Sequence, residues 1–366
     1  MSGITLRKSI LRWVAVGLAV SSSVVGIITV LSGVTLSDLA KLGYLPFGLA
    51  ATASLARLLV QNLRFRLLVS GLVGDPRPDF SGVAIARMGS EFVALSTPAM
   101  VGGEFVRAAW LAKRGVDGGK ALWIAYFEIL VDVYVGSALA LASAWFAFTR
   151  GAPVIAVSIV AIVSVLVVGY TVFFLIPALR GIPKIPHRLF AVAASLIGDA
   201  RARRLEEVAQ ERTRTFSLAA GSILRKDALP LVFKTLALSV IQLLLAGLAL
   251  WFILVAAGLR IDFLSSTLLA GGVSALAAIP ISIGGSGVVE ISMLSYLSSV
   301  FGFSSWGAII VWRIASFQVV LAVTGVAFLL LIRGSTRRAR AKDSPKYPDS
   351  LPVASISENV QASSEV

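Results

Sequence analysis

The sequence predicts an all-α, polytopic membrane protein, a helical bundle, from three observations. Of the 366 residues, 57% are hydrophobic and only 14% are charged, and the mean hydropathy is +0.89. Four stretches contain no charged residue: 13–37, 151–179, 235–259 and 263–289. Each exceeds the roughly 20 residues that a helix needs to span a bilayer. These runs lack the alternation of barrel strands, so helices must satisfy the backbone N–H and C=O groups inside the lipid.

The composition also excludes several classes of site. The chain has no cysteine and a single histidine, His187, so neither disulfides nor clustered cysteine or histidine ligands are available. We therefore expect no metal and no cofactor. The excess of 33 Lys and Arg over 19 Asp and Glu is typical of basic cytoplasmic loops that face anionic lipid. Membrane lipids, and no nucleic acid, are the expected partners.

The basic stretches indicate on which side of the membrane each loop lies. Basic residues precede residue 13, fill 64–77 and 180–230, and follow residue 332. The positive-inside rule makes these stretches cytoplasmic, with both termini inside a multi-pass protein of the plasma membrane. Six full spans are expected: 13–31, 44–63, 121–148, 152–179, 231–257 and 306–332.

The chain divides into a transmembrane domain, 1–332, and a basic then polar disordered tail, 333–366. The first apolar run is too long for a signal-peptide core, so we expect it to be retained. Within the domain, the cytoplasmic loop 180–230 should carry an amphipathic helix at about 189–208 that lies on the anionic leaflet.

Two further apolar blocks, 80–109 and 263–305, each have both flanks on one side of the membrane. A helix of about 30 residues reaches about 45 Å, whereas two crossings need about 60 Å. We therefore predict that 80–109 is a re-entrant hairpin entering from the cytoplasmic face. The block 263–305 is either a deep hairpin or two tight crossings, and it enters from the opposite face.

The two blocks share a local pattern near their centres. The sequences are Pro98-x-x-x-Gly102-Gly103-Glu104 and Pro280-x-x-x-Gly284-Gly285. Because the spans that bracket the two blocks run in opposite directions, the blocks would belong to inverted repeats. Paired interrupted segments indicate a binding site near the bilayer midplane. The free N–H groups of a broken helix would attract an anion such as phosphate.

Charged side chains also fall inside the apolar blocks, where each costs about 2.5–3.5 kcal/mol at the bilayer centre. They are Arg57, Arg87, Glu91, Glu104, Arg107, Glu128, Asp132, Glu290 and Arg313. Spacing predicts local pairs between Arg87 and Glu91 (i,i+4) and between Glu104 and Arg107 (i,i+3). For the first pair, a structural ion pair and a functional role are equal alternatives.

Glu128 and Asp132 are also spaced i,i+4, which places two acids on one helix face. They should repel each other unless a cation, a proton or an arginine lies between them. Arg57 and Arg313 are the expected partners across the bundle. A structural network is the alternative, but the absence of a local cation favours a functional role for Glu128, Asp132 and Glu290.

Three motifs together carry a resemblance to a known family. They are Thr97-Pro98-x-x-x-Gly102-Gly103-Glu104-x-x-Arg107, Glu128-x-x-x-Asp132, and Pro280-x-Ser282-x-Gly284-Gly285-x-Gly287-x-x-Glu290 with a later Arg313. From the first helix to the last span, the chain resembles the lysyl-phosphatidylglycerol synthase transmembrane-region family of flippase-like membrane proteins. The resemblance implies a domain that flips aminoacylated phosphatidylglycerol or handles other phospholipids or polyprenyl-linked sugars. The soluble domain that transfers lysine from tRNA has no counterpart here, so we expect no synthase activity.

The predicted function is translocation of an anionic or aminoacylated phospholipid, or of a lipid-linked head group. Its phosphate would meet Arg107, Arg313 and the broken-helix N-termini, and an amine would meet Glu128, Asp132 or Glu290. The first alternative is a proton-coupled secondary transporter of a small polar solute, which inverted repeats suit equally well.

The second alternative is a membrane enzyme, or an accessory subunit of lipid- or glycan-modifying enzymes. The sequence offers no nucleophile–base pair, and residues 284–287 lack the Lys-Ser/Thr that completes a phosphate loop. A separate synthase or glycosyltransferase and a homodimer are both compatible with the sequence as further partners.

Overall fold

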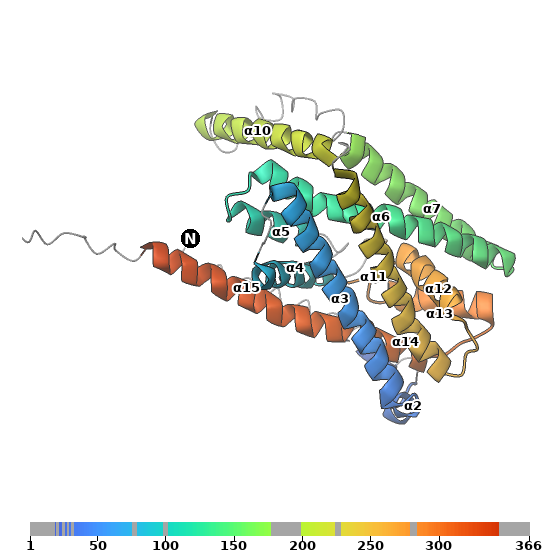
Figure 1. The fold of residues 1–366 in the computed structure, drawn as a ribbon. Helices are drawn as coiled ribbons and strands as arrows, with labels where there is room; N and C mark the ends of the chain where they lie inside the picture. The colour runs from blue at the N-terminus through green and yellow to red at the C-terminus, as the bar shows by residue number, and fades with distance from the viewer. Residues whose placement is uncertain are drawn as a thin grey trace, which may run out of the picture.

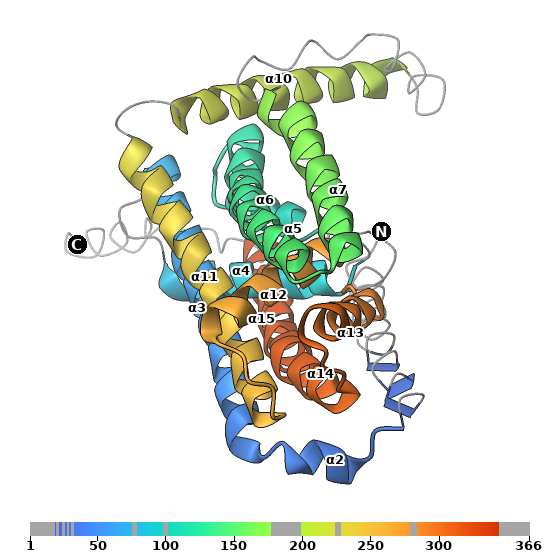
Figure 2. The same cartoon turned by 90° about the vertical axis from the view of Figure 1, so that its right-hand side faces the viewer.

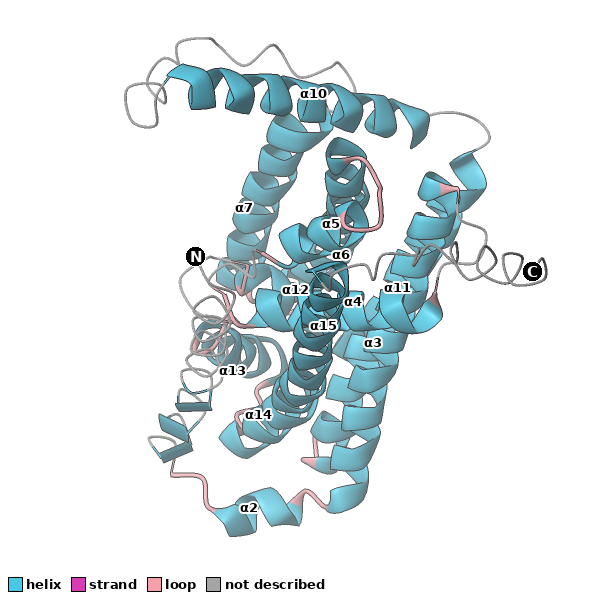
Figure 3. Cartoon of the chain, turned by 90° about the vertical axis from the view of Figure 1, so that its left-hand side faces the viewer, coloured by secondary structure: helices cyan, strands magenta, loops and turns pink. Residues whose placement is uncertain are grey.

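The computed structural model describes residues 33–74, 79–97, 102–176, 199–223, 228–278 and 284–343, with a few positions between 19 and 30. Throughout these residues the chain forms helices and no strand (Figures 1 and 3). The predicted all-α class is therefore confirmed. Several predictions fall outside the described residues: His187, Pro98, Pro280 and Ser282, most of the first span at 13–31, and the tail beyond 343.

Four described helical runs are long and apolar enough to cross a membrane. They are α6 (Gly118–Thr149), α7 (Pro153–Tyr170), α11 (Leu229–Ala256) and a last run of α14 (Trp306–Arg313), η3 (Ile314–Gln318) and the first part of α15 (Val319–Asp343). A short π-helix, η1 (Thr171–Leu175), continues α7. Large apolar side chains such as Trp145 and Val154 point outward. A soluble protein rarely exposes so many, which agrees with lipid as the surrounding solvent.

The helix α3 (Tyr44–Val73) corrects the predicted second span. We expected the span to end at residue 63 and a basic cytoplasmic stretch to follow. Instead the helix continues to Val73, where the left-handed Gly74 (φ 85°) provides the C-cap. Arg and Leu, which favour helices, make up half of residues 64–73. Arg64 therefore lies inside the helix and is buried.

Both interrupted blocks are helical hairpins with a break in the middle. The first consists of α4 (Phe80–Leu95) and α5 (Gly103–Ala112), and the second of α12 (Phe263–Leu276) and α13 (Val288–Phe301). At about 1.5 Å per residue, none of these helices can span a core of about 30 Å. This favours the hairpin for 263–305 over two tight crossings. The carboxylates of Asp79 and Asp262 cap the first helix of each pair.

The two hairpins open toward opposite ends of the bundle. The helix α10 (Asp199–Ile223) lies across one end, and the short α2 (Leu36–Lys41) lies at the other (Figure 2). The first hairpin leaves from the end of α3 and returns to the start of α6, both on the α10 side. The second connects the end of α11 to the start of α14, both on the α2 side. The described part of α10 also extends well beyond residue 208, the predicted end of the amphipathic helix.

The packing of the helices has the symmetry that an inverted repeat requires. α3 and α11, the helices that precede the two hairpins, pack along each other. α4 of the first hairpin packs against α15, and α12 of the second hairpin packs against α6. Each hairpin therefore lies against the span that follows the other hairpin along the chain. An exchange of the two halves leaves this pattern of neighbours unchanged.

Close contact between α6 and α10 depends on Gly119, which yields a stability prediction. A Cβ atom at Gly119 would lie 2.1 Å from the carbonyl oxygen of Arg212 and 2.1 Å from the hydroxyl of Thr215. We expect Gly119→Ala to force α10 away and to lower the stability by about 1–3 kcal/mol. Thermal unfolding in detergent and limited proteolysis of α10 measure the two effects.

Gly136→Ala is the matched control, because Gly136 lies on the same helix and a Cβ there would meet no atom within 4 Å. Equal stability of the two variants would contradict the proposed close packing.

Candidate functional site

Glu128 of α6 lies at the centre of a buried network of charges. Its side chain is 1% exposed, and three guanidinium groups from three other helices surround it. Arg64 of α3 contacts Oε1 at 2.9 Å, Arg87 of α4 contacts Oε1 at 2.9 Å, and Arg107 of α5 contacts Oε2 at 3.3 Å. One carboxylate thus joins the first hairpin to the spans on both sides of it.

Asp132 extends this network by one helical turn toward α11. The guanidinium of Arg64 binds both carboxylate oxygens of Asp132, with Nη2 at 2.7 Å from Oδ2. Ser239 donates to Asp132 at 3.2 Å, and Gln242 also donates to it. Arg64 therefore lies between Glu128 and Asp132 and supplies the cation that the spacing of these two acids requires. The side chain of Asp132 is still 32% exposed.

The two pairs predicted from local spacing have different outcomes. Arg87 and Glu91 form the predicted i,i+4 ion pair, with Nη1 at 2.7 Å from Oε2. Glu104 and Arg107 form no ion pair with each other, so that prediction is wrong. Glu104 instead accepts from the backbone N–H of Gly102 at 3.1 Å, because the first turn of a helix offers unpaired N–H groups. This leaves Arg107 to bind Glu128.

Arg57 does not have the expected partner across the bundle. In the described part of the chain it forms no ion pair, and its buried Nε has no hydrogen-bond acceptor. It nevertheless lies close enough to Glu91 to act on it electrostatically. Arg57 thus belongs to a cluster of charged side chains on α3, α4, α5 and α6 that also holds Arg64, Arg87, Arg107, Glu91, Glu104, Glu128 and Asp132.

Glu290 and Arg313 form a second buried pair, which connects α13 to α14. Arg313 Nε lies 2.9 Å from Glu290 Oε1, so Arg313 has the predicted role of a partner for a buried acid. Arg313 also donates to the carbonyl of Gly284 at 2.6 Å and lies over the ring of Phe317, 4.0 Å from its centroid. Phe317 belongs to the π-helix η3, a type of helix that is frequently found at functional sites.

The breaks of the two hairpins meet. A Cβ atom at Gly284 would lie 2.8 Å from the carbonyl oxygen of Leu95 at the end of α4, and one at Gly103 would lie 2.6 Å from the carbonyl of Ser90. Only glycine fits these positions, and the positive φ of Gly284 (59°) adds a second reason. Gly284 therefore lies beside the end of α4 in the first hairpin, as a shared central site requires.

The N-termini of the two hairpin helices are capped by carboxylates. Glu104 binds the N–H of Gly102 at the start of α5, and Glu290 binds the N–H of Gly287 at 2.6 Å at the start of α13. These acids neutralise the positive ends of the helix dipoles. In this conformation the guanidinium groups, rather than the helix N-termini, are the groups that an anion would meet.

Sequence reasoning missed Arg64, Ser239 and Gln242. A signal for Arg64 exists, since Arg57, Gln61 and Arg64 follow the i, i+4, i+7 spacing of one helix face. The polar partners on α11 have no comparable signal, because serine and glutamine cost less than charges in a membrane helix and occur there for many reasons.

The network generates a prediction about stability. Arg64→Met removes the cation that, among the described residues, Glu128 and Asp132 share, and should destabilise the protein by about 3–5 kcal/mol. Chemical unfolding in detergent is the measurement. Arg66→Met is the control on the same helix. Among the described residues Arg66 forms no ion pair and lies over the ring of Phe80, 5.3 Å from its centroid, so this variant should lose about 1 kcal/mol at most. A similar loss of stability in both variants would show that the buried network stabilises the protein no more than the contact of Arg66 does.

Two comparisons with known proteins complete the description of the site. A comparison with curated proteins gives no match. A family model described as "Lysylphosphatidylglycerol synthase TM region" matches residues 14–324 and so includes both hairpins and both buried ion-pair sites. Since the match covers most of the chain and agrees with the resemblance seen in its motifs, this protein belongs to the lysylphosphatidylglycerol synthase TM region family.

Proposed function

We propose that this protein translocates an anionic or aminoacylated phospholipid, or a lipid-linked head group, across the membrane. The family points to lipid modification or translocation. One observation carries the finer proposal: two broken hairpins from opposite ends of an apolar bundle meet beside buried ion pairs. Inverted repeats of this kind bind their substrate between the repeats and expose it alternately to the two sides.

The network can exchange its internal partners for those of a head group. A phosphate would bind Arg57, whose Nε has no acceptor, and then compete with Glu91 for Arg87. An amine would bind the acids that still reach solvent, which are Asp132 (32% exposed) and Glu91 (14% exposed). Each exchange replaces one charge-assisted contact by another, so the charges stay paired while the lipid moves.

Glu128 has a different role in this proposal. Three guanidinium groups contact it, and its protonation would leave them without their shared anion. It therefore positions the arginines and does not itself bind the substrate. This also weighs against Glu128 as the proton carrier of a coupled solute transporter. Asp132 and Glu91 are the acids in the network that suit such a role.

We also propose the sidedness, partners and location of the protein. The α10 end carries exposed arginines and corresponds to the basic loop, so we assign it to the cytoplasmic side of the plasma membrane. A separate synthase or glycosyltransferase would supply the modified lipid there. A homodimer is compatible with this arrangement.

The test is transport in proteoliposomes with fluorescent phosphatidylglycerol, its lysylated form and phosphatidylcholine. The protein should accelerate the movement of the first or the second above that in empty vesicles. No acceleration for any anionic or aminoacylated lipid would overturn the proposal. Uptake of a soluble solute driven by a pH gradient would support the alternative transporter.

A matched pair of variants tests the assignment of Asp132. Asp132→Asn keeps the shape of the side chain but loses its charge, so transport of the lysylated lipid should fall about tenfold or more. Ser239→Ala removes one hydrogen bond to the same carboxylate and keeps the charge, so transport should be largely retained. Size-exclusion profiles verify folding. Equal transport by the two variants would exclude Asp132 as the amine-binding acid.

A further inference from the structure

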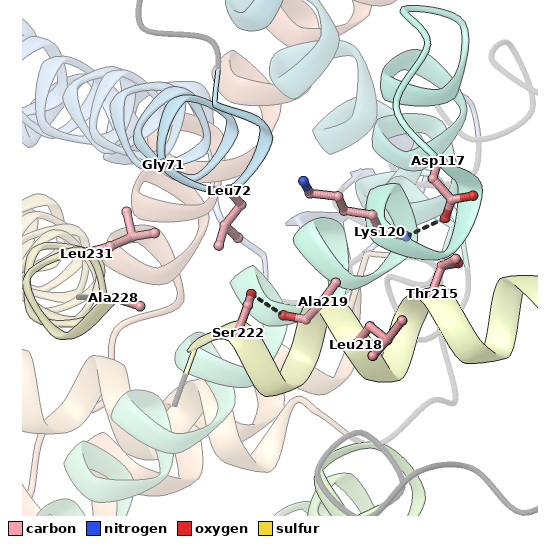
Figure 4. Close-up of a pocket in the computed structure, with 10 residues that line it drawn as sticks. All are labelled: Gly71, Leu72, Asp117, Lys120, Thr215, Leu218, Ala219, Ser222, Ala228 and Leu231. Atoms are coloured by element: carbon pink, nitrogen blue, oxygen red, sulfur yellow. Dashed lines mark hydrogen bonds between the residues drawn. The ribbon is translucent and has the colours of Figure 1, made fainter. Parts of the chain in front are cut away.

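A second candidate binding site lies at the α10 end, away from the buried charge network. A cavity of about 560 Å³ opens between the last turns of α3, the start of α6, α10 and the start of α11 (Figure 4). Its walls include Leu72 of α3, Leu218 of α10 and Leu231 of α11. It is therefore bounded by three apolar helices of the bundle and by the helix that lies across their ends.

Lys120 is the cation of this cavity. Its ammonium group extends from α6 into the space beside Leu72 (Figure 4). It forms no ion pair with any residue that the structure describes. A lysine on an apolar wall, without an acid to pair with, is suited to bind an anion that carries apolar groups.

The acid that lines the cavity, Asp117, is already engaged. Its carboxylate accepts from the backbone N–H groups of Gly119 at 2.9 Å and Lys120 at 3.2 Å. The Thr215 hydroxyl and these N–H groups hold the pKa of the Asp117 carboxyl below its ordinary value. Asp117 therefore stays ionised as the N-cap of α6, and it forms no ion pair with the Lys120 ammonium.

The surroundings have the character of a membrane surface. α10 exposes Arg203, Arg204, Arg212 and Arg214 together with two acids, Glu207 and Glu211, so its exposed charges are positive overall. The same region exposes large apolar side chains, including Leu218 (65%) and Phe233 (67%). A helix with basic and apolar faces across the ends of apolar spans lies at the level of the lipid head groups. Basic side chains at that level attract anionic lipids by about 1 kcal/mol each.

We propose that this cavity holds the head group of one anionic phospholipid from the leaflet that α10 faces. The lipid phosphate binds the Lys120 ammonium, and the acyl chains follow the apolar surface formed by Leu218 and Leu231. The bound lipid then connects α10 to α3 and α11. This site is separate from the network around Glu128, and it does not depend on whether the protein transports lipid.

Lipid retention by the purified full chain tests this proposal. The protein is prepared with phosphatidylglycerol or with phosphatidylcholine, and the bound lipid is measured by native mass spectrometry at increasing detergent. Lys120→Gln should weaken retention of phosphatidylglycerol about fivefold, and Lys120→Arg should restore it. Lys113→Gln removes the same charge from an exposed position near the start of α6 and should change retention little.

A second variant tests the cavity without a change of charge. Ser222 lines the cavity, and its hydroxyl donates to the carbonyl of Ala219 in its own helix at 2.6 Å. Ser222→Trp should fill the space and reduce phosphatidylglycerol retention as well. Retention that is equal in the wild type, Lys120→Gln and Ser222→Trp would overturn the proposal. So would equal losses in the Lys120 and Lys113 variants, or equal retention of phosphatidylcholine.

Free phosphate is the remaining source of the same anion. Inorganic phosphate at millimolar concentration should not displace the bound phosphatidylglycerol, because it lacks the apolar contacts. If it does displace the lipid, the cavity is a site for free anions and the lipid assignment is wrong.

Discussion

The burial of Glu128 is the constraint on which the rest of this structure depends. A carboxylate in an apolar bundle is tolerable only when cations and hydrogen-bond donors replace the lost water. The chain supplies three arginines, each from a different helix, and so the relative positions of α3, α4, α5 and α6 are fixed together. Buried ion pairs add little stability compared with apolar packing. Their contribution here is to specify one arrangement of helices that nonpolar side chains alone would leave loosely defined.

The second repeat contains an equivalent ion pair in which the acid and the arginine have exchanged places. In the first repeat, Arg107 on the second hairpin helix binds Glu128 on the span that follows. In the second repeat, Glu290 on the second hairpin helix binds Arg313 on the span that follows. Both ties join a short helix to its neighbouring span near the break. Each pair is neutral by itself, so in both halves a buried carboxylate is satisfied by an arginine from a neighbouring helix.

The sequence was informative where the signal is local. The apolar runs located four of the six expected spans, the glycine pairs located both breaks, and the i,i+4 spacing predicted the Arg87–Glu91 pair. Prediction from the sequence failed where groups far apart in the chain, or backbone groups, compete for the same charged side chain. Glu104 lies within reach of Arg107 along the chain, but its carboxylate accepts a hydrogen bond from the backbone N–H of Gly102 instead. Arg64 looked like a basic flank because its partners lie more than 60 residues away on α6, and only the packing of α3 against α4, α6 and α11 reveals them.

The distribution of contacts also indicates which part of the bundle can move in the proposed cycle. If α3, α4 or α5 moved away from α6, Glu128 would lose an arginine partner in a medium of low dielectric constant, which is costly. These four helices should therefore move together as one rigid unit. The contact between Gly284 and Leu95 joins the two hairpins, and no ion pair among the described residues connects them. Opening is therefore least costly where the second hairpin meets the first.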